Sequence, residues 1–537
     1  MSKSFPLTRR AVFGVAAGLA AVPVLGLPHG AQAAPVRGGK MVFARYADSL
    51  FLDPVMTDAN VDIWVMTNIY DTLLRPTNDG MSIEPGLATR WTVTDAGKTV
   101  TLTLRHGVKF SDGADLAASD VAWSLERARN PKIGPWSDLV SSIDKVEIAA
   151  PDTVVLRLKH PDPSILPALA TFNTAIMPQK LFEAAAGATD ADKAKAYGAK
   201  PVGTGPFQLV DWQRGVSMKL VRNPHYWNKA ADGSALPYLD ELDFVIIPDD
   251  ATRLLKLKAG EVDGTEFVPY SRVKELQTDP NLRMELWPST KVTYLTMNVR
   301  PKLKNGAANP LSNEKVRQAL NYAVNKEAII AITTLGLGKP MGSFMSSTTP
   351  LYDGPKPLYP YDLATAKKLM AEAGFAKGFE VSCISLAGNQ DYLNNLTAIQ
   401  QMWAQIGVTL AIEQMDNPTL VARYRAGDFS LRTSAWTNDI SDPSEITSYF
   451  AYFPNIGSLH SGWDNKEVDA LFLQSQQEVD PAKRAAEYKQ IQDIYNGSAP
   501  ILYLYETPYP VAFRKKARGF VQIPLGNNIF ETAYIEA

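Results

Sequence analysis

Short strand patterns and amphipathic helix patterns alternate along this chain from about Arg37 to its end, with no fixed repeat period. In the first half, residues 91–94 and 99–104 have the period-two pattern of two strands around a turn. In the second half, residues 396–406 have helical spacing, and a strand pattern over 408–413 follows at once. Alternation in both halves predicts an α/β fold with two lobes, whose mixed sheets are flanked by helices.

The length of 537 residues also favours more than one lobe, because single hydrophobic cores stop growing at about 250–300 residues. No long Gly/Ser linker divides the sequence, so we expect extended hinge strands to join the lobes. In such architectures a ligand binds between the lobes, near the ends of strands. We therefore expect an interlobe cleft.

Residues 1–33 have the pattern of a signal peptide. A basic start precedes an apolar stretch over 11–27, and Ala-Gln-Ala at 31–33 matches a cleavage pattern. The Arg9-Arg10 pair resembles the twin-arginine export signal, and an ordinary Sec signal with two arginines is the alternative. The cleavage region has no cysteine that could carry a lipid anchor. We expect an exported protein, soluble in the periplasm of a double-membraned bacterium.

The sequence carries few residues suited to catalysis or metal binding. Its single cysteine, Cys383, excludes an intramolecular disulfide and a cysteine metal cluster. The common hydrolase and zinc-protease motifs are absent, and no two of its five histidines stand at metal-ligand spacing. The net charge of −2 excludes a basic nucleic-acid footprint. We therefore expect no catalytic residue, no metal, no cofactor and no nucleic-acid partner.

An aromatic-rich, charge-sparse stretch over 428–445 most favours a ligand site. Residues 429–435 have a strand pattern, and a turn follows. Asp442 is predicted as the N-cap of the next helix, with Glu445 at its N3 position. Asp439 lies in the loop between strand end and helix start, where a carboxylate can face a ligand.

Several blocks of sequence resemble one family. The strongest runs from Val202-Gly-Thr-Gly-Pro-Phe207 to His225-Tyr-Trp227, and its two glycines are expected to permit a tight turn. These blocks resemble the oligopeptide-, dipeptide- and nickel-binding periplasmic proteins of ABC importers, which are family 5 of the bacterial extracellular solute-binding proteins. The resemblance covers essentially all of the chain after the leader. Further blocks that follow the family's order lie at 108–113, 118–125, 316–320 and 361–374.

This resemblance implies a periplasmic binding protein fold of class II with an extra inserted domain. The first lobe is implied to be discontinuous, over 36–70, 200–285 and 510–537. A small domain over 71–199 is inserted into it, and a third lobe over 286–509 closes on the ligand. Ligand binding would shift an open-to-closed equilibrium, and the closed form would dock on an inner-membrane ABC permease.

The resemblance also implies candidate ligand-binding residues. In peptide-binding relatives an Asp after the Trp of the strand-end motif holds the peptide's α-ammonium group, and the match here is Asp439, three residues after Trp436. The alternative is that Asp439 caps its own loop. Trp436 either supplies a flat apolar wall to the ligand or lies in the core. Arg432 stands four residues before Trp436, whereas some oligopeptide binders carry an Arg three before, and one residue of shift turns a strand side chain to the other face.

Three further candidates are placed with less direct support. Architecture alone adds Tyr46, at the end of the first strand, and Asn298, in the strand that enters the third lobe. Dipeptide binders place an Arg for the ligand carboxylate in the loop that matches 385–392, and this chain has none there. Asn389 in that loop would suit a neutral polar ligand.

The function implied is solute binding, without enzymatic activity, for an ABC importer of a short peptide or peptide-like amine. The protein is expected to act as a monomer. Two alternatives stay open. The same fold could bind a non-peptide solute, such as an oligosaccharide or an opine-like compound. The protein could also be a periplasmic peptide chaperone or sensor that never delivers to a permease.

Overall fold

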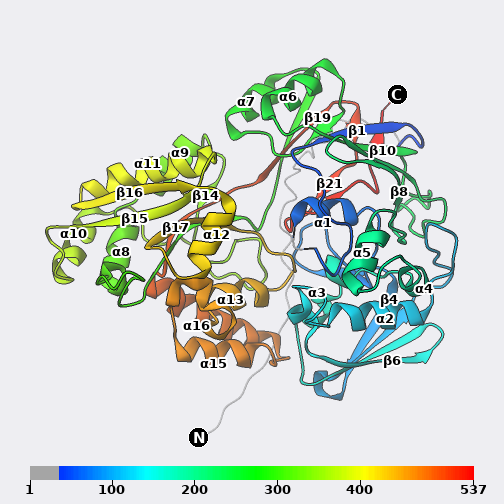
Figure 1. Ribbon diagram of the computed structural model, residues 1–537, viewed down its shortest axis with the longest axis horizontal. Coiled ribbons are helices and arrows are strands. Elements are labelled where there is room, and N and C mark those ends of the chain that lie inside the picture. Colours follow the sequence, from blue (N-terminus) through cyan, green and yellow to red (C-terminus); the bar gives the residue numbers. More distant parts are fainter. Residues whose placement is uncertain (1–34, 58, 537) are drawn as a thin grey trace, which may run out of the picture. The chain divides into compact units, whose positions relative to one another are not determined.

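The computed structural model describes residues 35–57 and 59–536, so the predicted signal peptide lies outside the described residues. No helix within these ranges is long and apolar enough to cross a membrane. Residues 36–537 form one compact unit that contains three large sheets (Figure 1). The boundaries expected for three lobes therefore stay a prediction, although each large sheet draws its strands from the residues expected for one lobe or its edge.

A seven-stranded mixed sheet joins distant parts of the sequence. Its spatial order is β12 (Leu282–Trp287), β19 (Tyr509–Arg514), β11 (Gly264–Thr265), β1 (Lys40–Arg45), β10 (Glu241–Ile246), β9 (Ser217–Arg222) and β8 (Phe207–Gln213). β1 is parallel to both of its neighbours, with Phe43 opposite Phe244 and Gly264. Phe43 is fully buried and packs on Phe513 and Phe530. The helices associated with this sheet are α1 (Asn60–Met66), α6 (Asp250–Ala259) and α7 (Tyr270–Thr278).

A four-stranded antiparallel sheet is built from one continuous stretch of chain. Its order is β4 (Ala88–Thr94), β5 (Thr99–Leu104), β7 (Thr153–Leu158) and β6 (Ile143–Ala150). Alternate residues of β5, such as Val100 and Leu102, are fully buried, and they pack with α2 (Ala118–Ala128). The hairpin predicted at 91–104 is confirmed. The other helices of this region are α3 (Ile165–Ala168), α4 (Gln179–Glu183) and α5 (Asp190–Gly198).

The third large sheet has six strands and apolar helices on both faces. Its order is β14 (Lys339–Pro340), β18 (Ile501–Glu506), β13 (Val292–Met297), β17 (Leu431–Trp436), β15 (Phe379–Leu386) and β16 (Val408–Met415). Burial on both faces explains why every residue of β13 and β18 is buried. One helix group is α8 (Glu314–Tyr322), α9 (Lys326–Thr333), α10 (Leu363–Glu372) and α11 (Gln390–Ala404).

The second helix group of this sheet packs on Tyr294 and Tyr503. It comprises α13 (Ser444–Phe450), α15 (Lys466–Ser475) and α16 (Pro481–Ser498). The predicted helix over 396–406 and the strand that follows it are confirmed as α11 and β16. The remaining elements are α12 (Asn417–Arg425), α14 (Phe453–Ile456) and the strand pairs β2 (Leu74–Pro76) with β3 (Ile83–Pro85), β20 (Ala517–Arg518) with β23 (Tyr534–Ile535), and β21 (Val521–Gln522) with β22 (Asn528–Ile529).

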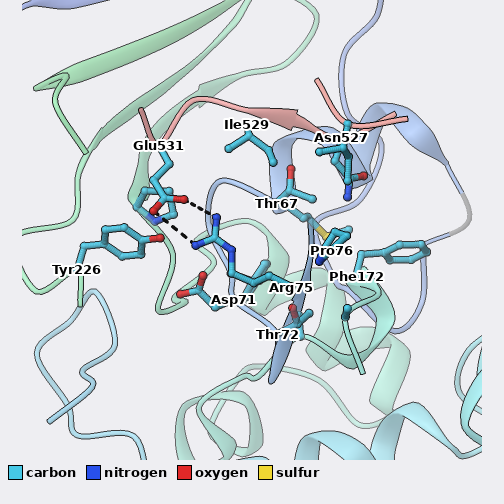
Figure 2. Close-up of a pocket in the computed structure, with 16 residues that line it drawn as sticks. Thr67, Asp71, Thr72, Arg75, Pro76, Phe172, Tyr226, Asn527, Ile529 and Glu531 are labelled. Atoms are coloured by element: carbon cyan, nitrogen blue, oxygen red, sulfur yellow. Dashed lines mark hydrogen bonds and ion pairs between the residues drawn. The ribbon is translucent and has the colours of Figure 1, made fainter. Parts of the chain in front are cut away.

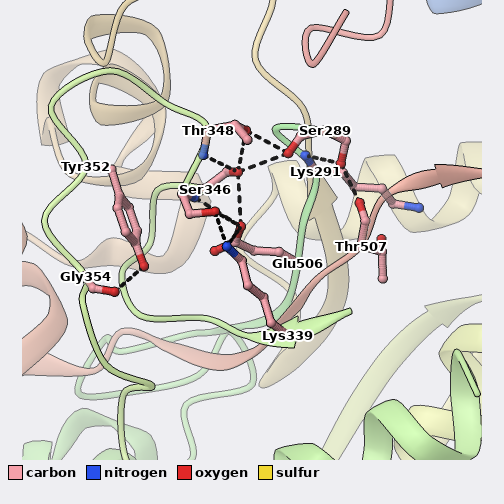
Figure 3. Close-up of polar contacts among 10 residues, drawn as sticks. Ser289, Lys291, Lys339, Ser346, Thr348, Tyr352, Gly354, Glu506 and Thr507 are labelled. Atoms are coloured by element: carbon pink, nitrogen blue, oxygen red, sulfur yellow. Dashed lines mark hydrogen bonds and ion pairs between the residues drawn. The ribbon is translucent and has the colours of Figure 1, made fainter. Parts of the chain in front are cut away.

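Two short chain segments link the seven-stranded and six-stranded sheets, between β12 and β13 and between β18 and β19. Ser289 on the first segment donates a hydrogen bond to the carbonyl of Thr507 on the second. Thr348 donates to the Ser289 carbonyl (2.8 Å), and Ser347 donates to the Glu506 carboxylate (2.7 Å) (Figure 3). The two hinge segments are therefore tied to each other and to the loop around 346–348.

The C-terminal part of the chain is fixed to the region around α1 and β2. Arg75 forms an ion pair with Glu531, beside a small cavity of about 70 Å³ (Figure 2). Asp71, which also lines this cavity, accepts hydrogen bonds from Thr204 (3.0 Å) and from the Trp227 indole (2.8 Å). Arg75 and Glu531 are paired with each other and Asp71 is hydrogen-bonded to neutral groups, so this region is a structural joint.

The glycines of the block at 202–207 let the backbone of this segment lie close to the backbone of Ile69. The chain bends at 204–206, where a tight turn was expected, but neither Gly203 nor Gly205 has a positive φ. A Cβ on Gly203 would lie 2.1 Å from the carbonyl oxygen of Ile69, and one on Gly205 would lie 2.6 Å from its carbonyl carbon. The amide of Gly205 donates to the Ile69 carbonyl at 2.9 Å, so only glycine fits here.

We predict that Gly203→Ala lowers the free energy of unfolding by about 1–3 kcal/mol, because the new methyl group overlaps the Ile69 backbone. Differential scanning calorimetry of the purified variant would measure this loss. Gly497→Ala is the control, since no heavy atom lies within 4 Å of its added Cβ. Equal melting temperatures for Gly203→Ala and the wild type would contradict the close approach.

Candidate functional site

Asp439 lies in the loop between β17 and α13, as the sequence predicted. The backbone N–H groups of Asp439 and Ile440 donate to the Glu445 carboxylate at 2.8 and 3.1 Å. Glu445 is buried and so fixes the loop from the first turn of α13. The Asp439 carboxylate accepts no hydrogen bond from any residue that the structure describes, although its own backbone is held firmly.

The pKa values of the Asp439 and Glu445 carboxyl groups are both raised. Burial raises the pKa of Asp439 to about 7. Burial, together with the nearby charge of Asp439, raises the pKa of Glu445 well above its usual range. One oxygen of Glu445 has no hydrogen-bond partner among the described residues. The pair therefore has unused capacity to accept hydrogen bonds and to hold a positive charge.

A third carboxyl group, Asp138, approaches from the short 3₁₀ helix Ser137–Val140 that precedes β6. Asp138 and Glu445 line one cavity of about 240 Å³. Burial raises the pKa of Asp138, and its charge adds to the increase in the pKa of Glu445. None of these three carboxyl groups forms an ion pair with a described residue, and no positive charge is among the main causes of their raised pKa values. The described residues also contain no group of three His, Cys, Asp or Glu side chains suited to a metal.

Aromatic rings lie near these carboxylates and on the seven-stranded sheet. Trp436 packs on Tyr449 with ring centroids 4.7 Å apart, and its indole N–H is buried without a partner. From the seven-stranded sheet, Tyr46 packs edge-on against Phe267 at 5.0 Å. Burial raises the pKa of Tyr46 to about 12, so this phenol stays neutral and can donate a hydrogen bond. Trp436 is half-buried, so the structure is compatible with both roles considered for it.

Tyr509 connects the aromatic wall to the Asp439 loop. Its phenol lies 3.4 Å from the Thr437 hydroxyl, and its ring packs edge-on against Phe267. Burial raises the pKa of Tyr509, and the charge of Asp439 contributes to this increase. The carboxylate of Asp439 therefore lies near the hinge strand β19.

Asn389 borders a second, larger cavity of about 590 Å³. Its side-chain oxygen accepts the N–H of Tyr392 at 2.9 Å and caps α11. Its side-chain amide nitrogen has no hydrogen bond within the described part of the chain. The role expected for Asn389 as a ligand contact stays a prediction, and its role as a helix cap is an additional finding.

Arg432 and Asn298 lie further along the strands from Asp439. The guanidinium of Arg432 lies over the ring of Tyr424, 4.2 Å from its centroid. Asn298 is fully buried, and its amide donates to the carbonyls of Gly427 (3.2 Å) and Phe429 (2.9 Å). Both side chains thus have structural partners, and their predicted ligand contacts stay untested.

The start of α13 differs from the prediction. The helix begins at Ser444, one residue later than a cap at Asp442 requires, and its N-cap is Pro443. Asp442 instead forms a buried bidentate ion pair with Arg484 at 2.7 and 2.8 Å, and it accepts the N–H of Ser444. The ion pair with a distant helix decides the position of Asp442, and local capping patterns contain no sign of it.

Sequence reasoning missed two residues of this site. The sequence predicts Glu445 only as a helix-capping residue, although the strand-loop-helix pattern could have suggested that it faces the same loop as Asp439. Asp138 carries no local signal, because it reaches the site from a distant element.

Comparisons with known proteins agree with the geometry. The family model of bacterial extracellular solute-binding proteins, family 5 (middle) matches residues 82–458. The chain is 30% identical to the glutathione-binding protein GsiB of Salmonella typhimurium, over 93% of this chain and 95% of that protein. It is 30% identical to the dipeptide-binding protein of Escherichia coli, over 87% and 89% of the two chains.

Comparison with a solved structure also indicates the periplasmic binding protein fold. The periplasmic binding protein DppA of Helicobacter pylori, in complex with the peptide STSA, superposes with a TM-score of 0.78 at 26% identity. The match covers 94% of this chain and 99% of that one. The family resemblance and the periplasmic binding protein fold predicted from the sequence are confirmed.

We predict that Asp439→Asn raises the melting temperature most at pH 8, less at pH 5, and little at pH 3.5. In the folded protein the pKa of Asp439 is raised from 3.8 to about 7, so folding favours the protonated form. The free energy of unfolding therefore falls as pH rises from about 4 to 7, and a neutral amide removes this loss. Thermal unfolding followed by circular dichroism at several pH values would measure it.

Asp442→Asn is the matched control for this experiment. It removes the ion pair with Arg484, so it should destabilise the protein by about 3–5 kcal/mol at pH 5 and at pH 8. If Asp439→Asn shows the same dependence of melting temperature on pH as the wild type, then Asp439 does not titrate as described.

Proposed function

Since this chain belongs to family 5 of the bacterial extracellular solute-binding proteins, we propose that it binds a short peptide or a peptide-like amine for an ABC importer. The proposal includes delivery of the closed, loaded protein to an inner-membrane permease. It also includes export by the twin-arginine leader at 1–33, a location in the periplasm without a lipid anchor, and action as a monomer.

One observation carries the proposed ligand class. Asp439, Glu445 and Asp138 converge from two separate regions of the chain, and none of them forms an ion pair with a described residue. Buried charges in proteins are normally paired, so an unpaired acidic cluster favours a positively charged ligand. An ammonium group can donate three hydrogen bonds, which suits the free carboxylate of Asp439 and the unpartnered oxygen of Glu445.

The neighbouring aromatic residues favour a ligand with an organic body. Tyr449, which packs on Trp436, and Tyr509, which packs on Phe267, lie near the carboxylates and offer flat apolar surfaces. The unpartnered indole N–H of Trp436 can donate to a peptide carbonyl. We keep Asp439, Trp436, Tyr46 and Asn389 as ligand contacts and assign Arg432 and Asn298 to support of the lobe.

Catalysis forms no part of the proposal. The perturbed carboxyl groups resemble those of active sites in their pKa values alone, and electrostatic binding of a cation accounts for them. GsiB and the dipeptide-binding protein are named for what they bind, and the family is one of binding proteins.

We predict that native mass spectrometry of the purified protein detects a co-purified peptide or peptide-like amine, because interlobe clefts often retain their solute. Isothermal calorimetry with that solute should show that Asp439→Ala weakens binding by about 10- to 150-fold. The control Asp493→Ala removes an acidic residue from the exposed face of α16 and should leave the affinity unchanged. A retained sugar, or equal affinities for Asp439→Ala and the wild type, would reject the amine-binding proposal.

We also predict that affinity for the amine ligand falls at low pH. Ammonium binding requires an ionised Asp439, whose pKa in the unliganded protein is about 7. Affinity should therefore be nearly constant above pH 8 and should fall by up to about tenfold per pH unit below 7. Calorimetry between pH 5 and 8.5 tests this, and a flat profile would show that Asp439 does not meet the ligand's charge.

A further inference from the structure

The cavity of about 590 Å³ lies between α6, α7 and the start of β19 on one side and α9 and α11 on the other. Its volume falls in the range of pockets for small organic ligands. Three charged side chains line it: Asp250, Lys291 and Asp391. The loop that holds a ligand-binding Arg in dipeptide binders borders this cavity, and here it supplies Asn389 and Asp391 with no basic residue.

Lys291 is the cation of this cavity. Its backbone N–H donates to Ser289 within the hinge network, and its side chain extends away from that network (Figure 3). Within the described part of the chain, its ammonium group forms no ion pair and no hydrogen bond. By contrast, Asp250 is already paired with Arg253, and the hydroxyl of Tyr270 is used by the Pro508 carbonyl.

Lys291 remains suited to binding an anion although it is half-buried. Burial lowers the pKa of Lys291, and the nearby charge of Asp391 counteracts this and favours the ammonium form. Asp391 lies beyond ion-pair distance from Lys291, so it supports the charge without occupying the donor groups. Lys291 therefore presents up to three N–H donors toward the cavity.

The position of Lys291 relates it directly to the Asp439 loop. The next residue, Val292, pairs with Trp436 across β13 and β17. Thr290, on the other side of Lys291, accepts the N–H of Asn438 at 2.9 Å. The backbones that carry Lys291 and Asp439 are therefore neighbours.

We propose that the ammonium of Lys291 binds the carboxylate of the ligand, so that the site takes zwitterionic di- or tripeptides in preference to simple amines. This inference rests on the proposed function, because it supplies the second end of a ligand whose ammonium meets Asp439. It also explains how the chain can hold a carboxylate without an Arg in the 385–392 loop. The cation comes from the hinge strand instead.

The experiment uses the full mature protein, freed of retained solute by partial unfolding and refolding. Pools of di- and tripeptides, each with a free or an amidated C-terminus, are the probes, and the tightest free peptide and its amide are taken to calorimetry. Amidation should weaken wild-type binding by about 10- to 150-fold. In Lys291→Met the free peptide should lose a similar factor, and amidation should then cost less than about threefold.

Two further variants make the result specific to this ammonium group. Lys274→Met removes an exposed lysine of α7 that does not line the cavity, and it should bind both forms as the wild type does. Lys291→Arg keeps the positive charge and should retain most of the discrimination between acid and amide. Circular dichroism melts verify folding, and Lys291→Gln, which also removes the positive charge, takes the place of Lys291→Met if that variant does not fold.

The outcomes separate the inference from the proposed function. If the wild type binds peptides but Lys291→Met still discriminates acid from amide as the wild type does, the assignment of Lys291 is wrong and the proposed function stands. If Lys291→Gln also discriminates acid from amide as the wild type does, the assignment is likewise wrong. If the wild type binds none of the peptides, both the proposed function and this inference are rejected.

Discussion

The hydrogen bond between Ser289 and the Thr507 carbonyl joins the two chain segments that connect the seven-stranded and six-stranded sheets. This hydrogen bond fixes the backbone next to two site residues, because Lys291 lies two residues from Ser289 and Tyr509 lies two residues from Thr507. The Asp439 loop reaches the same place through the contact of Asn438 with Thr290. Ligand charges and hinge geometry are thus adjacent, so a bound ligand can act directly on the segments about which the lobes would move.

The acidic cluster differs from the other buried charges of the protein because its carboxyl groups form no ion pair with a described residue. Arg45, Arg127 and Arg484 are buried beside carboxylates, and such pairs leave no charge unused. Asp439 and Glu445 have no such partner among the described residues, so their excess negative charge costs stability in the empty protein. Sites that bind ligands commonly keep such strain, because the ligand relieves it.

The helices and strands could largely be predicted from the sequence, because local patterns determine them: the 91–104 hairpin and α11 with β16 are examples. The loop position of Asp439 followed from the same reasoning. Interactions between distant residues could not be predicted this way. Asp442 pairs with Arg484, 42 residues away, and the approach of Asp138 to Glu445 depends on how two regions pack. The role of Gly203 depended on Ile69, which no turn pattern can reveal.

The joint between the C-terminal segment and α1 has a consequence for the order of folding. Asn68 donates to the Asn528 carbonyl and accepts the N–H of Phe530, across a sequence separation of 460 residues or more. β19 is also inserted between β12 and β11, two strands made more than 200 residues earlier. A ribosome must therefore release nearly the whole chain before the first sheet closes. Until then its apolar face stays uncovered, which makes the nascent chain dependent on protection from aggregation.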